Sequence, residues 1–209
     1  MYVRSQRAGK RVKESITRFL HGKLKLKVNE SKSAVDSPCR RKFLGFSFIF
    51  TSKQECKISI AHQALSEIKD TIRRFTRAHA GVSMRYRIER INQYLTGWIG
   101  YFALCEIPGT IEGLEGWLRR RLRLCMWTQW KKIRTKIRML KGLGLQETEA
   151  IKIAMTRKGA WRIASSPPLH NALDKAYFEQ QGLKSLIRRY NQLRESWRTA
   201  GCGTACPVV

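Results

Sequence analysis

Acidic side chains are scarce in this sequence. Its 209 residues contain 15 Asp and Glu against 42 Lys and Arg, which gives a net charge of +27 and a pI near 10.6. Such an imbalance indicates an anionic partner and says little about the fold. Hydrophobic residues make up 43% of the chain and aromatic residues 10%. This composition excludes a disordered basic tail and predicts one or two modest cores.

Long apolar runs are also missing. No run approaches the roughly eighteen residues of a membrane-spanning helix. The N-terminal segment MYVRSQRAGKRVKES has no apolar region of the length that signal peptides carry. We therefore expect a soluble, cytoplasmic protein that does not enter a membrane.

The sequence offers no pattern of metal ligands or catalytic residues. Its six cysteines form no C-x-x-C pair, and the nearest approach to a metal motif is Cys202-Gly-Thr-Ala-Cys206. Free cytosolic thiols are the better interpretation. Four histidines have neither mutual spacing nor nearby ligands: His21, His62, His79 and His170. The sequence thus predicts no metal site, no cofactor, and no Ser/His/Asp or Cys/His catalytic set.

The densest positive charge lies in residues 114–140, which the apolar spacing predicts as one uninterrupted helix. Apolar residues recur there every three or four positions, as on one buried helical face: Leu114, Trp117, Leu118, Leu122, Cys125, Met126, Trp130, Ile133, Ile137 and Leu140. Trp127 falls off this stripe, so it is the tryptophan that we expect to stack on a base. Trp117 and Trp130, at helical spacing, fit a core better.

The other faces of this segment carry cations, and no Asp or Glu lies between Glu115 and Glu147. Like charges on a helix repel by tenths of a kcal/mol per pair, and solvated faces usually mix both signs. Nucleic-acid phosphate is therefore the expected counter-charge, with a merely solvated basic face as the alternative. The predicted contacts are Arg119, Arg120, Arg121, Arg123, Trp127, Lys131, Lys132, Arg134 and Lys136.

Periodicity predicts a mainly α protein with a small α+β region at its start. Residues 7–20 have helical spacing, residues 24–28 and 43–50 alternate as strands, and residues 56–60 form a hairpin with the second of these. Helices are expected from Leu65 to Phe75 and from Met84 to Phe102, and with the basic helix they close a three-helix bundle. Short helices follow at 147–155, 160–164, 169–177 and 183–193, and a loose tail at 200–209.

Several motifs in this order resemble the C-terminal part of a group II intron reverse transcriptase/maturase. The segment from VRSQRAGKRVKES to KLKLKVNESKSAV, followed by KFLGFSF, resembles the last palm motifs. RIERINQYLTGWIGYF and LEGWLRRRLRLCMWTQWKK resemble the maturase-specific X, or thumb, domain. KGAWRIASSPPLHNALDKAYFEQQGLKSL resembles the C-terminal extension of bacterial members. The resemblance implies a palm remnant (1–60), a maturase bundle (61–141) and a basic extension (142–209).

The resemblance also places individual residues of the palm remnant. Asn29 and Lys32 match a motif whose lysine lies near the nucleotide phosphates, although a turn Asn and a surface Lys would look the same. Phe43, Leu44 and Gly45 match the primer-grip segment, where Gly lets a backbone approach nucleic acid; a Gly at a bend of a sheet is the alternative.

The family's metal-binding Tyr-Ala-Asp-Asp box should precede Met1, and the sequence holds no adjacent pair of acids in residues 1–60. Two-metal phosphoryl transfer needs such carboxylates, so we expect no polymerase activity. A truncated gene, a split protein or a misassigned start would each explain why the box is missing. Without the rest of the palm, the palm strands should expose apolar faces.

The resulting hypothesis is a maturase fragment that binds structured group II intron RNA, with target-site DNA as a further possible partner, and that assists intron folding and splicing. One alternative is half of a split reverse transcriptase, with a separate palm and fingers half-protein as partner. The other is an inert remnant of a mobile element.

Overall fold

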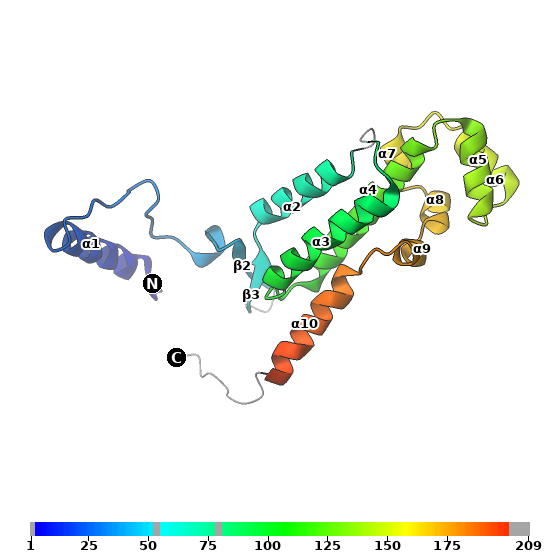
Figure 1. Cartoon of the computed structure of the whole chain (residues 1–209). Coiled ribbons are helices and arrows are strands. Elements are labelled where there is room, and N and C mark those ends of the chain that lie inside the picture. Colours follow the sequence, from blue (N-terminus) through cyan, green and yellow to red (C-terminus); the bar gives the residue numbers. More distant parts are fainter. Residues whose placement is uncertain (1–2, 52–54, 78–80, 201–209) are drawn as a thin grey trace. The chain divides into compact units, whose positions relative to one another are not determined.

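The computed structural model describes residues 3–51, 55–77 and 81–200, with side chains described as far as Trp197 (Figure 1). The chain divides into two compact units, Met1–Ser59 and Ile60–Val209. Helices make up most of the described residues, and the only sheet among them is small. The predicted mainly α fold class is therefore confirmed.

The first unit begins with α1 (Gln6–Gly22), which confirms the helix predicted at 7–20. The helix starts there because the Ser5 hydroxyl accepts a hydrogen bond from the Ala8 N–H at 3.2 Å, as an N-cap does. Gly9 is the buried residue of the helix, and a Cβ at this position would lie 2.5 Å from a methyl carbon of Val35. The glycine therefore permits the segment around Val35 to cross the helix closely.

The strand predicted at 24–28 is wrong. Lys25 has a φ of 55°, in the left-handed region, and the Leu26 N–H donates to the Leu20 carbonyl at 3.0 Å. Leu24 and Leu26 are more than half exposed. Alternating Leu and Lys fit a strand only when a neighbouring strand supplies backbone partners, and the described part of the chain contains none beside this segment.

The single strand predicted at 43–50 is also wrong, because a turn divides it. β1 (Lys42–Phe43) pairs antiparallel with β2 (Phe46–Phe50), with Phe43 opposite Phe46. The turn residues Leu44 and Gly45 have φ angles of 51° and 78°, the two positive values that a tight type I′ hairpin requires. A short 3₁₀ turn, η1 (Pro38–Arg40), precedes this hairpin.

The predicted hairpin arm at 56–60 is confirmed as β3 (Cys56–Ile60). It lies beside β2 in the sheet order β1-β2-β3, and the Thr51 N–H donates to the Glu55 carbonyl at the end of the hairpin, at 2.9 Å. The sheet is therefore a short meander.

The second unit is built on three helices that match the predicted bundle: α2 (His62–Phe75), α3 (Met84–Phe102) and α4 (Pro108–Gln129). Figure 1 shows them running alongside one another. Their inner faces are buried because apolar residues repeat at helical spacing, as with Ile68 and Ile72 on α2 and Leu118 and Leu122 on α4.

The basic segment is not one uninterrupted helix. α4 ends at Gln129 and α5 (Ile133–Gly142) starts after Trp130, Lys131 and Lys132. The Thr128 hydroxyl donates to the carbonyls of Leu124 and Cys125, both at 2.9 Å, and such back-bonding bends helices. Apolar periodicity continued through this break, so the spacing alone did not reveal it.

Five further helices follow: α6 (Glu147–Ala154), α7 (Ala160–Ile163), α8 (Pro167–Ala172), α9 (Lys175–Gln180) and α10 (Leu186–Ala200). The helix predicted at 169–177 is divided, because the Asp174 side chain accepts from the Tyr177 N–H at 2.8 Å and starts a new helix. The predicted loose tail, apart from Ala200, lies outside the described residues.

These late helices pack on the bundle. α6 packs on α5, α7 packs on α4, and α10 packs on both α3 and α4. The predicted bundle (61–141) and the predicted extension (142–209) therefore lie in the same compact unit.

Candidate nucleic-acid interface

Arg123 on α4 is buried, with 4% of its surface exposed. Its Nε donates to the Ala164 carbonyl at 2.9 Å and its Nη1 to the Leu173 carbonyl at 3.2 Å. Burial, followed by repulsion from Arg119 and Arg120, lowers the pKa of Arg123 to about 10, so the guanidinium stays charged at neutral pH. The predicted phosphate contact by Arg123 is wrong, because the side chain bonds the ends of α7 and α8 to α4.

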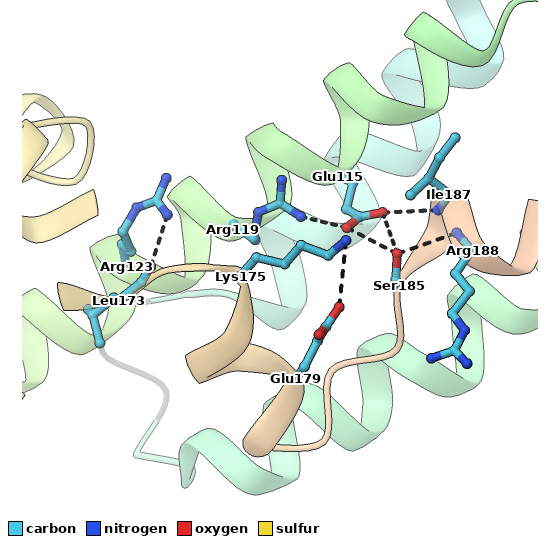
Figure 2. A network of polar contacts seen from close by, with 9 residues as sticks. All are labelled: Glu115, Arg119, Arg123, Leu173, Lys175, Glu179, Ser185, Ile187 and Arg188. Carbon is cyan, nitrogen blue, oxygen red and sulfur yellow. Dashed lines mark hydrogen bonds and ion pairs between the residues drawn. The ribbon is translucent and has the colours of Figure 1, made fainter. Parts of the chain in front are cut away.

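Arg119 belongs to a network around a buried carboxylate (Figure 2). Its Nη1 donates to Oε1 of Glu115 at 2.5 Å, and Glu115 is only 4% exposed. The Ser185 hydroxyl donates to both carboxylate oxygens, at 3.3 and 3.2 Å, and the Ile187 N–H donates to Oε2 at 3.0 Å. Glu115 therefore satisfies backbone and hydroxyl donors at the N-terminus of α10 and joins that helix to α4.

Arg120 and Arg121 are also bonded within the protein. Arg120 donates from Nε and Nη2 to the Trp161 carbonyl, at 3.3 and 2.9 Å. Arg121 donates to the hydroxyl and carbonyl of Thr76 at the end of α2, at 3.1 and 3.2 Å. Both side chains are half-buried, so their first role is to hold α7 and α2 against α4.

Trp127, predicted to lie off the apolar stripe, is buried, with 5% of its surface exposed. Its ring meets that of Trp130 edge-to-face, with centroids 6.3 Å apart, and the Lys136 Nζ lies 4.2 Å from its centroid. A covered ring has no free face for a base, so the predicted stacking by Trp127 is wrong in this structure.

The remaining predicted cations lie after the helix break. Lys131, Lys132 and Arg134 are exposed, as is Arg138 one turn beyond Arg134, whereas Lys136 is half-buried. None of the four exposed side chains takes part in an ion pair within the described parts of the chain. They form a cationic surface, the α5 surface, that consists of Lys131, Lys132, Arg134 and Arg138.

The positive charge continues beyond α5. Cations at this end of the unit, from residue 131 to residue 166, are Lys131, Lys132, Arg134, Lys136, Arg138, Lys141, Lys152, Arg157, Lys158 and Arg162, against Glu147 and Glu149 as the acids. Figure 1 shows α5, α6 and α7 at the same end of the second unit. The sequence predicts a basic extension at 142–209, without singling out any of its residues. The available signal was the lack of any acid between Glu149 and Asp174.

The palm motif remnants lie in turns of the first unit. The Asn29 side-chain oxygen accepts from the Lys32 N–H at 3.1 Å and from the Ser31 hydroxyl at 2.7 Å, and Lys32 is exposed. Phe43 and Leu44 are exposed at the β1–β2 turn, which Gly45 completes. This geometry is that of a turn Asn and a turn Gly, the alternatives left open for these residues.

Metal ligands do not gather within residues 3–51, 55–77 and 81–200, where no group of three or more His, Cys, Asp or Glu could hold an ion. His79, Cys202 and Cys206 lie outside these ranges. Among the described helices, none combines the length and the apolar character that crossing a membrane requires.

The second unit is thus a basic helical bundle with a cationic end. Residues 65–143, from α2 to just beyond α5, match the family model described as "Group II intron, maturase-specific domain". The chain therefore contains a maturase-specific domain, and its resemblance to the C-terminal part of a group II intron reverse transcriptase/maturase is confirmed. A comparison with curated proteins gives no match.

Proposed function

We propose that this chain binds structured group II intron RNA and assists the folding and splicing of that RNA. The observation that carries the proposal is the maturase-specific domain at residues 65–143. The charge distribution supports it, because the domain ends in the α5 surface, whose four cations have no acidic partner among the described residues. Phosphate is the anion that such a surface accommodates best.

The mechanism is positional and electrostatic. Exposed Lys and Arg side chains of the α5 surface contact phosphates, while the α4 arginines keep α2, α7, α8 and α10 in fixed places around the bundle. A rigid layout of phosphate contacts favours one arrangement of the RNA domains over others. The intron RNA itself performs the phosphoryl transfer in this proposal.

Preference for intron RNA tests the proposal. We expect the chain to bind a folded group II intron transcript at least about tenfold, or 1.4 kcal/mol, more tightly than the antisense transcript of equal length. Both affinities should be measured at about 200 mM salt, because non-specific binding to phosphate is weak there. Filter binding or fluorescence anisotropy gives both affinities. Equal affinity for the two transcripts would contradict a function in intron recognition.

A second candidate, half of a split reverse transcriptase, is favoured by the surface of the first unit. Phe19, Phe43 and Phe50 are 56%, 68% and 63% exposed. Large exposed aromatic side chains on a small sheet and helix mark a surface that other polypeptide covers. In this candidate, the palm and fingers half-protein named above supplies that cover and the catalytic carboxylates.

We expect no primer extension from the 209-residue chain alone with Mg²⁺ or Mn²⁺. Its aspartates, Asp36, Asp70 and Asp174, form no adjacent pair that could hold two metal ions over a phosphate. The measurement is template-dependent incorporation of labelled dNTP, with a heat-denatured sample as the blank. Incorporation above that blank would contradict the expectation, and incorporation only after addition of a palm and fingers polypeptide would favour the second candidate.

A further inference from the structure

Trp161 is a large exposed ring at the cationic end of the second unit. It lies on α7, outside the matched domain, and 39% of its surface is exposed. The exposed part of the ring is accessible to a ligand, and a tryptophan ring offers a large apolar surface for contact. Its neighbours in sequence include three exposed cations, Arg157, Lys158 and Arg162.

The guanidinium of Arg120 on α4 packs against the Trp161 ring. The Arg120 guanidinium carbon lies 3.9 Å from the ring centroid, and the same guanidinium donates two hydrogen bonds to the Trp161 carbonyl. Arg121 is more distant, 6.0 Å from the centroid. Stacking and main-chain bonding by one side chain hold the ring in a single orientation, so a ligand that stacks on it loses little further freedom.

A hollow lies beside Arg162, the residue that follows Trp161 in the sequence. It has a volume of about 840 Å³ and is lined by residues of α6, α7 and α8. Lys152, Lys158 and Arg162 supply positive charge to its wall, Ser166 supplies a hydroxyl, and Glu149 is the carboxylate present. Three cations against one acid give the hollow a net positive charge, which suits a phosphate group.

We propose that Trp161 stacks on an unpaired nucleobase of the bound RNA, with a neighbouring phosphate in the hollow that Arg162 lines. Aromatic side chains stack on bases of any sequence, but only where the base is out of a duplex. The inference rests on the proposed RNA-binding function and extends it to α6, α7 and α8. It also gives Arg120 a role, because Arg120 positions the stacking ring.

The test compares two RNA probes and three variants. One probe is a hairpin with an unpaired loop, and the other is a blunt duplex with the same stem. Trp161→Leu should weaken binding to the looped RNA about tenfold, in line with the stacking of one base, and leave duplex binding unchanged. Trp161→Phe should keep most of the affinity. Trp197→Leu is the matched control, because Trp197 is 41% exposed on α10, and it should change neither affinity.

Other outcomes would contradict either the stacking site or the proposed function. Wild-type affinity of Trp161→Leu for the looped RNA would overturn the stacking site alone, and an equal loss on both probes would show that the ring serves only the fold. Failure of the wild-type chain to bind these probes and the folded intron transcript would overturn the proposed function as well, whereas failure on the probes alone would overturn only the stacking site.

A second measurement does not depend on how a variant folds. In the wild-type chain, photo-crosslinking with 5-iodouridine in the loop should modify Trp161, as mapped by mass spectrometry. Crosslinks only at other residues would overturn the inference and would leave the ring as a surface for a protein partner.

Discussion

Replacement of Glu115 by Ala should destabilise the second unit by about 3–5 kcal/mol. The change removes the acceptor for the Arg119 guanidinium, the Ser185 hydroxyl and the Ile187 N–H, and these donors lie in a site where Glu115 is only 4% exposed. A half-buried charge and two half-buried donors would lose these hydrogen bonds. For a unit of this size the midpoint of thermal unfolding should fall by roughly 6–20 °C.

Glu112 supplies the matched control on the same helix. It lies one turn before Glu115 and is exposed, so Glu112→Ala should change the stability by no more than about 0.5 kcal/mol. Glu115→Gln should fall between the two, because the amide oxygen can still accept one of the hydrogen bonds. Unfolding by urea, followed by circular dichroism, measures all three variants. Equal stability of Glu115→Ala and Glu112→Ala would show that the α4–α10 network contributes nothing.

The helices could be predicted because their buried residues repeat within the helix itself. Ile68 and Ile72 on α2, or Leu118 and Leu122 on α4, signal a buried face whatever packs against it. Strands are different, since a strand exists only with a neighbour, and the alternation of Leu24 and Leu26 with lysines says nothing about whether a neighbour is present. The turn at Leu44 and Gly45 was missed because the apolar residues continue through it.

Several residues predicted for the candidate site bond within the protein instead, whereas Lys131, Lys132 and Arg134 are exposed. Arg123 and Arg120 have the same side chain as Arg134, yet their carbonyl partners, Ala164 and Trp161, lie 41 residues further along the chain. Nothing local in the sequence distinguishes an arginine that bonds a distant carbonyl from one that faces solvent. Trp127 is a related case, because it falls off the apolar stripe and yet its ring is buried, in contact with the Trp130 ring and with Lys136 beyond the helix break.

The variant with the largest expected effect on RNA binding removes the α5 surface. It combines Lys131→Gln, Lys132→Gln, Arg134→Gln and Arg138→Gln. We expect its affinity for group II intron RNA to fall at least tenfold, or about 1.4 kcal/mol. The fold should be unchanged, because these side chains are exposed and, unlike Arg120 or Arg123, bond to no distant carbonyl among the described residues.

A control with the same loss of charge separates position from net charge. Exposed cations near α9 and α10 provide it, as Lys175→Gln, Lys184→Gln, Arg188→Gln and Arg189→Gln. If net charge alone attracted the RNA, both variants would lose the same affinity. The account instead predicts a clearly smaller loss for the control.

The central claim is that the α5 surface contacts RNA phosphates, and the salt dependence of the affinity tests it most directly. The affinity is measured from about 50 to 200 mM salt. Each phosphate contact adds roughly 0.7 to 0.9 to the slope of log K against log salt. The wild-type chain, the α5 variant and the control variant are measured on the same intron RNA. The account predicts that the slope falls by about two to three units in the α5 variant and by less than about one unit in the control. An unchanged slope in the α5 variant, with its helical circular dichroism intact, would contradict the account and place the RNA contacts elsewhere.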